Sequence, residues 1–143
     1  MSVEENKAIV SRFYREVLNG KNMQVAEEVL DPNFKDWAAP PHPGSELDFL
    51  KGFWPHVWRT AFPDWEITPQ DMLADGNKVA VRYTATGTHA NEFMGMPGTG
   101  KRINVTGMNL FRLENGKIAE EWGNMDMMGL MQQLGAVPSG PPP

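Results

Sequence analysis

Two aspartates in the sequence have neighbours that suit an acid or base catalyst. Asp36 precedes Trp37 and the proline-rich stretch 38–45, where partial desolvation would raise its pKa toward that of a general base. An exposed loop carboxylate is the alternative for this position. Asp126 follows the strand-like stretch IAEEWGNM and precedes the apolar segment MMGLMQQLG. It is therefore either a helix N-cap, a role that lowers its pKa, or a catalytic group.

Two further polar residues fall on strand faces that are otherwise apolar. His89 shares its face with Val81 and Tyr83, and is either a buried neutral ring or a proton carrier, since His titrates near pH 7. Asn109 interrupts the apolar alternation of residues 103–113 and needs a partner, inside the protein or on a ligand. His89 therefore joins the two aspartates as a candidate catalytic residue, and Asn109 is a candidate binding residue.

The chain is rich in side chains that can line an apolar cavity. It has five Trp, seven Phe and ten Met among 143 residues, and such groups either fill a core or surround a hydrophobic ligand. Trp122 shares the strand phase of Ile118, Glu120 and Asn124, which predicts that this series faces a cavity. The predicted substrate-binding residues are Phe13, Tyr14, Trp37, Trp54, Trp58, Arg82, Asn109 and Trp122.

Composition and spacing argue against several functional classes. A net charge of −5 disfavours nucleic acid, whose binding relies on basic patches. Cysteine is absent, and the three histidines lack the spacing of metal ligands. The sequence GMPGTGKR, residues 95–102, lacks the Ser or Thr of a phosphate loop and precedes a strand. We therefore expect no metal, no cofactor and no nucleic acid.

The N-terminal sequence and the apolar runs indicate where the protein works. MSVEENKAIV lacks the apolar core of a signal peptide, and no run approaches 18 apolar residues. We therefore expect no membrane association and a cytoplasmic location.

The hydrophobic periodicity changes once along the chain, from helical to strand-like. Helical spacing covers residues 2–18, 23–30 and 45–61, the last with Pro55 as a kink, and alternation covers 65–73, 78–89, 103–113 and 117–124. A last helix covers 127–134. Helices followed by strands predict an α+β fold, in which a curved antiparallel sheet wraps the N-terminal helices as a cone-shaped barrel. Its open end is the predicted pocket. We expect one domain over 1–137 and a disordered proline-rich tail over 138–143.

The sequence GTHANEFMGMPGTGKRINVTGMNLFRLENGKIAEEWGNMDMMGLMQQLG, residues 87–135, resembles the C-terminal half of the SnoaL-like polyketide cyclases, also called ester cyclases. The shared features are G-x-H, then the loop G-x-P-x-x-G-K, then R-x-x-x-G-K-I. The resemblance implies the cone-shaped barrel of nuclear transport factor 2, assembled as a homodimer or homotetramer. It also implies a cofactor-free intramolecular aldol condensation of a hydrophobic carbonyl substrate, with an aspartate as the base.

The chain departs from that family at the residues that the resemblance makes catalytic. Aligned on GKI, the family's aspartate falls on Gly123, a histidine falls on Asn109, and an asparagine falls on Asp36. Two interpretations follow. In the first, the protein is an enzyme of the cyclase or isomerase type with a relocated acid/base, using Asp36 or Asp126 together with His89. In the second, it binds an apolar ligand without catalysis, or follows a divergent chemistry.

Overall fold

The computed structural model describes residues 1–137, without the side chain of Trp54, so the predicted tail 138–143 lies outside the described residues. The chain begins with α1 (Val3–Arg12), which continues into the π-helical segment η1 (Phe13–Asn19). A capping box starts α1, because Glu5 N donates to Ser2 Oγ at 3.0 Å and Ser2 N donates to Glu5 Oε1 at 3.1 Å. The predicted first helix is confirmed.

Three shorter helical segments follow in the first half of the chain. They are α2 (Met23–Val29), α3 (Glu46–Phe53) and the rod formed by η2 (Trp54–Trp58) and α4 (Arg59–Ala61). Pro55 lies inside η2, where the wider π-helical turn replaces regular α-helix. The predicted kink is thus a change of helix type within one rod.

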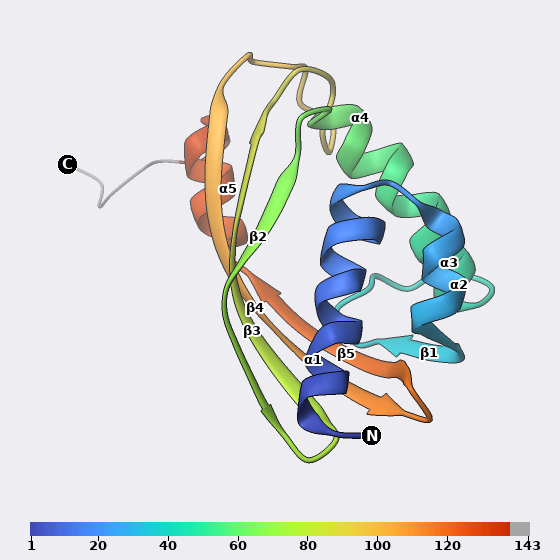
Figure 1. Cartoon of the computed structure of the whole chain (residues 1–143). Helices are drawn as coiled ribbons and strands as arrows, with labels where there is room; N and C mark the ends of the chain where they lie inside the picture. Colours follow the sequence, from blue (N-terminus) through green and yellow to red (C-terminus); the bar gives the residue numbers. More distant parts are fainter. Residues whose placement is uncertain (138–143) are drawn as a thin grey trace.

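A five-stranded sheet makes up the rest of the fold. Its strands are β1 (Leu30–Asp36), β2 (Glu66–Asp75), β3 (Lys78–Thr88), β4 (Arg102–Glu114) and β5 (Lys117–Met125). Their order is β1-β5-β4-β3-β2, with β1 parallel to β5 and the other pairs antiparallel. The sheet curves around α1 without closing (Figure 1). The predicted α+β cone is confirmed, and the sheet is mixed because β1 joins it in parallel.

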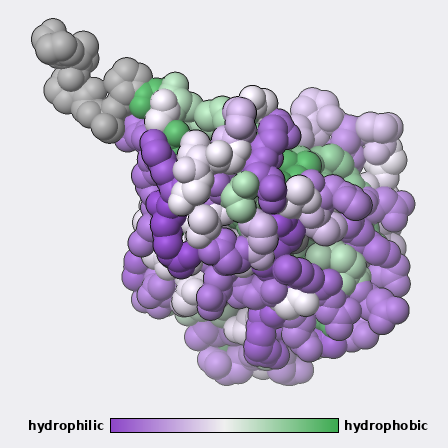
Figure 2. All heavy atoms as spheres, turned by 90° about the horizontal axis from the view of Figure 1, so that it is seen from above, coloured by the Kyte–Doolittle hydropathy of each residue, from purple (hydrophilic) through white to green (hydrophobic). Residues whose placement is uncertain are grey.

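Alternation along the strands decides which side chains enter the core. On β3 and β4 the inward residues include Val79, Val81, Tyr83, Ile103, Val105 and Phe111, all buried in one core that also contains residues of α1 and η1. The outer surface seen from above is mainly hydrophilic, with apolar side chains in small separate patches (Figure 2). Within residues 1–137 no helix is long and apolar enough to cross a membrane.

The last helix, α5 (Met127–Leu134), follows directly after β5 and covers the part of β4 that β5 leaves unpaired. Gln133 supplies this edge with a substitute strand partner, because Asn104 N donates to its Oε1 at 2.8 Å and its Nε2 donates to Asn104 O at 2.9 Å. Gly135, with φ of 83°, ends the helix in the left-handed conformation, which glycine adopts without steric cost.

A buried arginine joins α4 to the end of η1 and to the residue that precedes β2. Arg59 is 8% exposed, and its guanidinium donates to Trp65 O at 2.7 Å, to Asn19 O at 2.8 Å and to Leu18 O. Without the guanidinium, these backbone carbonyl groups would lose a hydrogen-bond donor. The guanidinium therefore holds α4 in place, next to Trp58, which lines the cavity described below.

We expect Arg59→Leu to lower the free energy of unfolding by about 3 kcal/mol, because it removes charge-assisted hydrogen bonds and leaves buried carbonyls unsatisfied. Urea denaturation followed by circular dichroism measures this loss. Arg15→Leu is the matched control, since the Arg15 side chain is 70% exposed, and should change stability little. Equal losses in both variants would contradict the role given to Arg59.

Candidate active site

A cavity of about 410 Å³ opens between the sheet and the helices of the first half. That volume lies within the range of small-molecule sites. It is formed by the end of β1 with residues 38–53, by the inner faces of β2 to β5, and by side chains from η1, η2 and the start of α5. The lining residues are Phe13, Leu18, Asp36, Ala38, Ala39, Pro40, Glu46, Phe49, Leu50, Phe53, Trp58, Ile67, Tyr83, Asn109, Glu121, Gly123, Asn124, Met125 and Met127.

A β-bulge in β5 decides which of its residues face this cavity. Leu113 of β4 pairs with Ile118, whereas Arg112, the residue before it, pairs with Glu120. Strand β5 therefore carries one extra residue, Ala119. Both Ile118 and Ala119 are buried as a result. Because one extra residue reverses the alternation, the residues beyond the bulge exchange faces. Glu121 and Gly123 consequently line the cavity.

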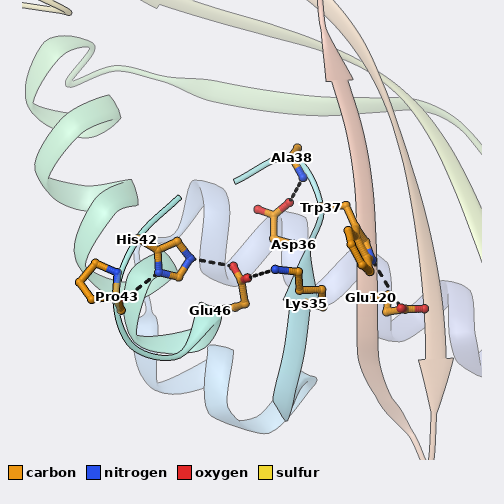
Figure 3. A network of polar contacts seen from close by, with 8 residues as sticks. All are labelled: Lys35, Asp36, Trp37, Ala38, His42, Pro43, Glu46 and Glu120. Atoms are coloured by element: carbon orange, nitrogen blue, oxygen red, sulfur yellow. Dashed lines mark hydrogen bonds and ion pairs between the residues drawn. The ribbon is translucent and has the colours of Figure 1, made fainter. Parts of the chain in front are cut away.

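Glu121 lies beside Asp36, and together they form a carboxylate pair on the cavity wall. The two residues are partners in the parallel ladder of β1 and β5, where neighbouring strands lie about 4.8 Å apart. Trp37 N donates to Glu121 O at 2.9 Å and fixes this register. One oxygen of Asp36 accepts from Ala38 N at 2.9 Å (Figure 3). The Glu121 carboxyl has no hydrogen-bond partner among the described residues.

Burial of both carboxyl groups, and the charge of Asp36 beside Glu121, change the ionisation of this pair. Desolvation, followed by the charge of Asp36, raises the pKa of Glu121 to about 8. Desolvation also raises the pKa of Asp36, although the hydrogen bond from Ala38 opposes that shift. Glu121 is half-buried, and it lines the cavity. Near neutral pH the pair therefore holds one proton and one negative charge.

An amide and a phenol lie next to the pair. Asn109 Nδ2 donates to Tyr14 Oη at 2.7 Å, so the predicted partner of this inward amide is inside the protein. Burial strongly raises the pKa of Tyr14, which stays neutral. Asn109 Oδ1 lies against Gly123, where a Cβ would come within 2.6 Å of it. The amide thus takes the space next to Gly123 that a side chain there would need.

The outer wall of the cavity, residues 38–53, is fastened by a polar network on Glu46. Glu46 Oε1 accepts from Lys35 Nζ at 2.8 Å, and Glu46 Oε2 is 3.0 Å from His42 Nε2 (Figure 3). The hydrogen bond to Glu46 raises the pKa of His42. The His42 ring also stacks on Phe49 with centroids 4.0 Å apart. The wall is therefore attached to β1 by charge and to itself by stacking.

Several predicted residues meet at this cavity. Asp36, Phe13, Trp58 and Asn109 line it, and Tyr14 lies behind Asn109. Asp36 and Asn109 come from strands that are far apart in sequence, and β5 brings them together by pairing with both β1 and β4.

Two predicted catalytic residues lie elsewhere. Asp126 is exposed and caps α5, accepting from Gly129 N at 2.9 Å, so the capping alternative describes its contacts. His89 is fully buried at the end of β3, outside the cavity lining. Its ring lies 5.6 Å from that of Phe62, and Nδ1 is 3.0 Å from Thr99 Oγ1. His89 therefore anchors the loop that follows β3.

Three predicted binding residues point away from the cavity, and a fourth is not described. Trp37 is 56% exposed and meets Glu120 on the outside (Figure 3). Arg82 follows inward Val81, so alternation turns it outward to Asp71, with Nε 2.7 Å from Oδ2. Trp122 lies on the outer face of β5 because of the bulge. The side chain of Trp54 lies outside the described part of the chain.

Glu121 is the main residue that sequence analysis missed. Strict alternation assigns Glu120 and Trp122 to the cavity, and only the bulge reverses that assignment. The signal in the sequence is the adjacent apolar pair Ile118 and Ala119, which breaks the alternation just before Glu121. Among residues 1–137 no cluster of three or more possible metal ligands occurs.

A curved, unclosed sheet around helices, with a polar pair in an apolar cavity, defines a small-molecule-binding domain of the nuclear transport factor 2-like class. The sequence profile of SnoaL-like polyketide cyclases matches residues 8–134. The chain belongs to the SnoaL-like polyketide cyclase family. Among curated proteins none matches the sequence.

Solved structures show the same fold along nearly the whole chain. TsrD from Streptomyces laurentii has a TM-score of 0.85 and 23% identity, with 96% of this chain and 99% of that chain covered. IdmH from Streptomyces antibioticus has a TM-score of 0.79 and 30% identity, with 91% and 98% covered. AclR from Streptomyces galilaeus has a TM-score of 0.81 and 26% identity, with 98% and 87% covered.

We expect Glu121→Gln to stabilise the protein at pH 8 by about 2 to 4 kcal/mol and to change stability little near pH 4. The folded protein keeps the Glu121 proton up to about pH 8, whereas the unfolded chain loses it near 4.5. Between these values the unfolded state binds fewer protons, so wild-type stability falls as pH rises. Urea denaturation at both pH values measures the difference.

Glu120→Gln is the control for this experiment, because it removes the same charge from the outer face, where Glu120 pairs with Arg112 at 2.6 Å. No gain at pH 8 is expected from it. A Glu121→Gln protein no more stable than the wild type at pH 8 would contradict the raised pKa of Glu121.

We expect Gly123→Ala to destabilise the protein by about 1 to 3 kcal/mol, because its Cβ displaces Asn109 Oδ1 and strains the bond to Tyr14. In an Asn109→Ala background the same change should be tolerated, giving a coupling of about 1 kcal/mol or more in a double-mutant cycle. Gly52→Ala, with open space around its Cβ, is the control. Additive effects of the two site substitutions would rule out the contact.

Proposed function

We propose that the protein is a cofactor-free acid/base enzyme of the cyclase or isomerase type, acting on a hydrophobic carbonyl compound. The observation that carries the proposal is the pair of Asp36 and Glu121 on the wall of an apolar cavity. Two adjacent carboxyl groups that share one proton supply a base and an acid at the same pH. In this proposal Glu121 replaces His89 as the acid/base partner of Asp36, and Asp126, the alternative to Asp36, takes no part in the reaction.

The proposed step is an enolisation in which protons balance. Ionised Asp36 takes a proton from the carbon next to the substrate carbonyl, and protonated Glu121 gives its proton to the carbonyl oxygen. The products are a neutral enol, a protonated Asp36 and an ionised Glu121. In a cyclase the enol carbon then attacks a second carbonyl of the same molecule, which closes the ring. In an isomerase the proton returns to a different carbon.

The apolar walls support this chemistry in two ways. They raise the pKa of the carboxyl groups, and they pack against a flat substrate. Phe13, Phe49, Phe53 and Trp58 surround the carboxyl groups with hydrocarbon and ring surface. Low polarity keeps the pKa of Glu121 close to the working pH, where an acid catalyst is most effective.

A second function, ligand binding without catalysis, is favoured by one specific feature. Gly123 has no side chain where the resembling cyclases have their aspartate, and the Asn109 amide closes the space. In this version the cavity stores or carries an apolar compound. The carboxylate pair would then contribute to binding alone.

The test uses proton exchange, which needs no knowledge of the natural substrate. β-Tetralone has acidic hydrogens between its ring and its carbonyl, and proton NMR in deuterated water follows their loss. We expect the protein to accelerate this exchange, and Asp36→Asn to lower that acceleration by roughly a hundredfold or more. Glu121→Gln should lower it by roughly tenfold or more, because an amide is a poor acid.

Glu120→Gln and Asp126→Asn are the matched controls, because both remove a carboxylate that does not line the cavity. Both should leave the exchange rate unchanged. Exchange that continues unchanged in the Asp36→Asn, Glu121→Gln double variant would reject the enzymatic proposal. Exchange no faster than in buffer, with β-tetralone bound, would favour the binding function.

Our proposal also includes the assembly and setting expected from the sequence. The protein works as a single domain over residues 1–137, as a homodimer or homotetramer, in the cytoplasm. Its substrate is small and hydrophobic, and neither nucleic acid nor membrane takes part.

A further inference from the structure

The charges around the cavity are unbalanced at one end. Three carboxylates line it, and among the described residues no lysine, arginine or histidine does. Glu46 is compensated from outside by Lys35 at 2.8 Å and His42 at 3.0 Å. The carboxylate pair of Asp36 and Glu121 has no comparable ion pair among residues 1–137. Its negative charge therefore faces the cavity without a cationic partner.

The ionisable groups around Glu121 add to this imbalance. From β1 it faces Asp36, and from η1 and β3 it faces Tyr14 and Tyr83, both of which stay neutral because burial raises their pKa. Glu46 on α3 adds a repulsive effect on Asp36, and Lys35 adds a weaker attraction. A positive charge placed in the cavity would thus find mainly negative and neutral groups.

The other polar and aromatic groups of the cavity fit a cation as well. Asn109 uses Nδ2 for Tyr14, which leaves its Oδ1 beside Gly123 as an acceptor. The rings of Phe13, Tyr83 and Trp58 line the same space, and aromatic faces attract cations through their quadrupole. Acceptors and ring faces surround an unpaired charge, which is the surrounding that an ammonium group requires.

We propose that the cavity takes an apolar ring compound whose protonated amine reaches Asp36 and Glu121. The ammonium group neutralises the shared negative charge, donates to the carboxylates and Asn109 Oδ1, and leaves the ring among the aromatic side chains. This inference shares the cavity with the proposed function but not its reaction, because an ammonium group on Asp36 and Glu121 occupies the base and the acid of the enolisation; the amine is therefore a ligand and not the substrate of that step. The binding preference itself needs no turnover.

Three naphthalene derivatives of nearly equal size test the preference: naphthylethylamine, naphthylethanol and naphthylacetate. Isothermal titration calorimetry on the full chain gives each dissociation constant at pH 7. We expect the amine to bind roughly tenfold or more tighter than the alcohol, and the acid roughly tenfold or more weaker than it. From pH 6 to about 8.5 the amine should bind severalfold tighter as Glu121 loses its proton, while the alcohol changes less than about twofold.

Variants assign the preference to the pair. Glu121→Gln should remove the pH dependence of amine binding, and the Asp36→Asn, Glu121→Gln double variant should bring the amine to the affinity of the alcohol. Glu120→Gln removes one charge from the outer face and should leave all three affinities unchanged. Alcohol binding in each variant shows that the cavity is intact, so loss of amine binding alone identifies the charge.

Two results would overturn the inference. One is an alcohol that binds as tightly as the amine to the wild-type protein, and the other is an equal loss of amine binding in Glu120→Gln and Glu121→Gln. Failure here is separable from failure of the proposed function. If the protein exchanges β-tetralone but shows no preference for the amine, the proposed function stands and the amine inference fails. If it prefers the amine but does not exchange β-tetralone, the amine inference stands and the proposed function fails.

Discussion

The parallel pairing of β1 with β5 places two carboxyl groups side by side on the wall of an apolar cavity, and the site depends on this pairing. In water Asp36 and Glu121 would both ionise near neutral pH. Within the fold, desolvation and repulsion hold one proton on the pair, with the pKa of Glu121 near 8. The fold offsets this cost with the sheet ladder and the buried core. An arrangement that opposes stability at neutral pH is typical of a functional site.

Most of the fold follows from local patterns, and this explains which expectations are confirmed. The capping box of Ser2 and Glu5, the turn at Gly76, and the glycine that ends α5 are read from neighbours in sequence. The strands β3 and β4 alternate without interruption, so the inward positions of Val81, Asn109 and Phe111 follow from a period of two. The parallel position of β1 is set by contacts distant in sequence and could not be read locally.

The site was harder to predict because membership of a cavity depends on register. Asp36 was identified from its local setting beside a proline-rich loop, and it does line the cavity. Local sequence left Asp126 as either a helix cap or a catalytic group, and in the structure its carboxylate caps α5 and does not line the cavity. Glu121 was missed because one extra residue in β5 exchanges its face with that of Trp122. A single bulge thus decides which of two neighbouring acidic residues, Glu120 or Glu121, faces a ligand.

The same register gives Gly123 its meaning. Glu121 lies two residues before Gly123 on one strand, so both positions share the inner face and are about 6.6 Å apart. A carboxyl group at the earlier position still faces the cavity, and it lies beside Asp36. Asn109 Oδ1 takes the space next to Gly123 that a side chain at position 123 would need. In the proposed mechanism the reacting carbon therefore lies nearer β1 than in a cyclase whose base stands at position 123.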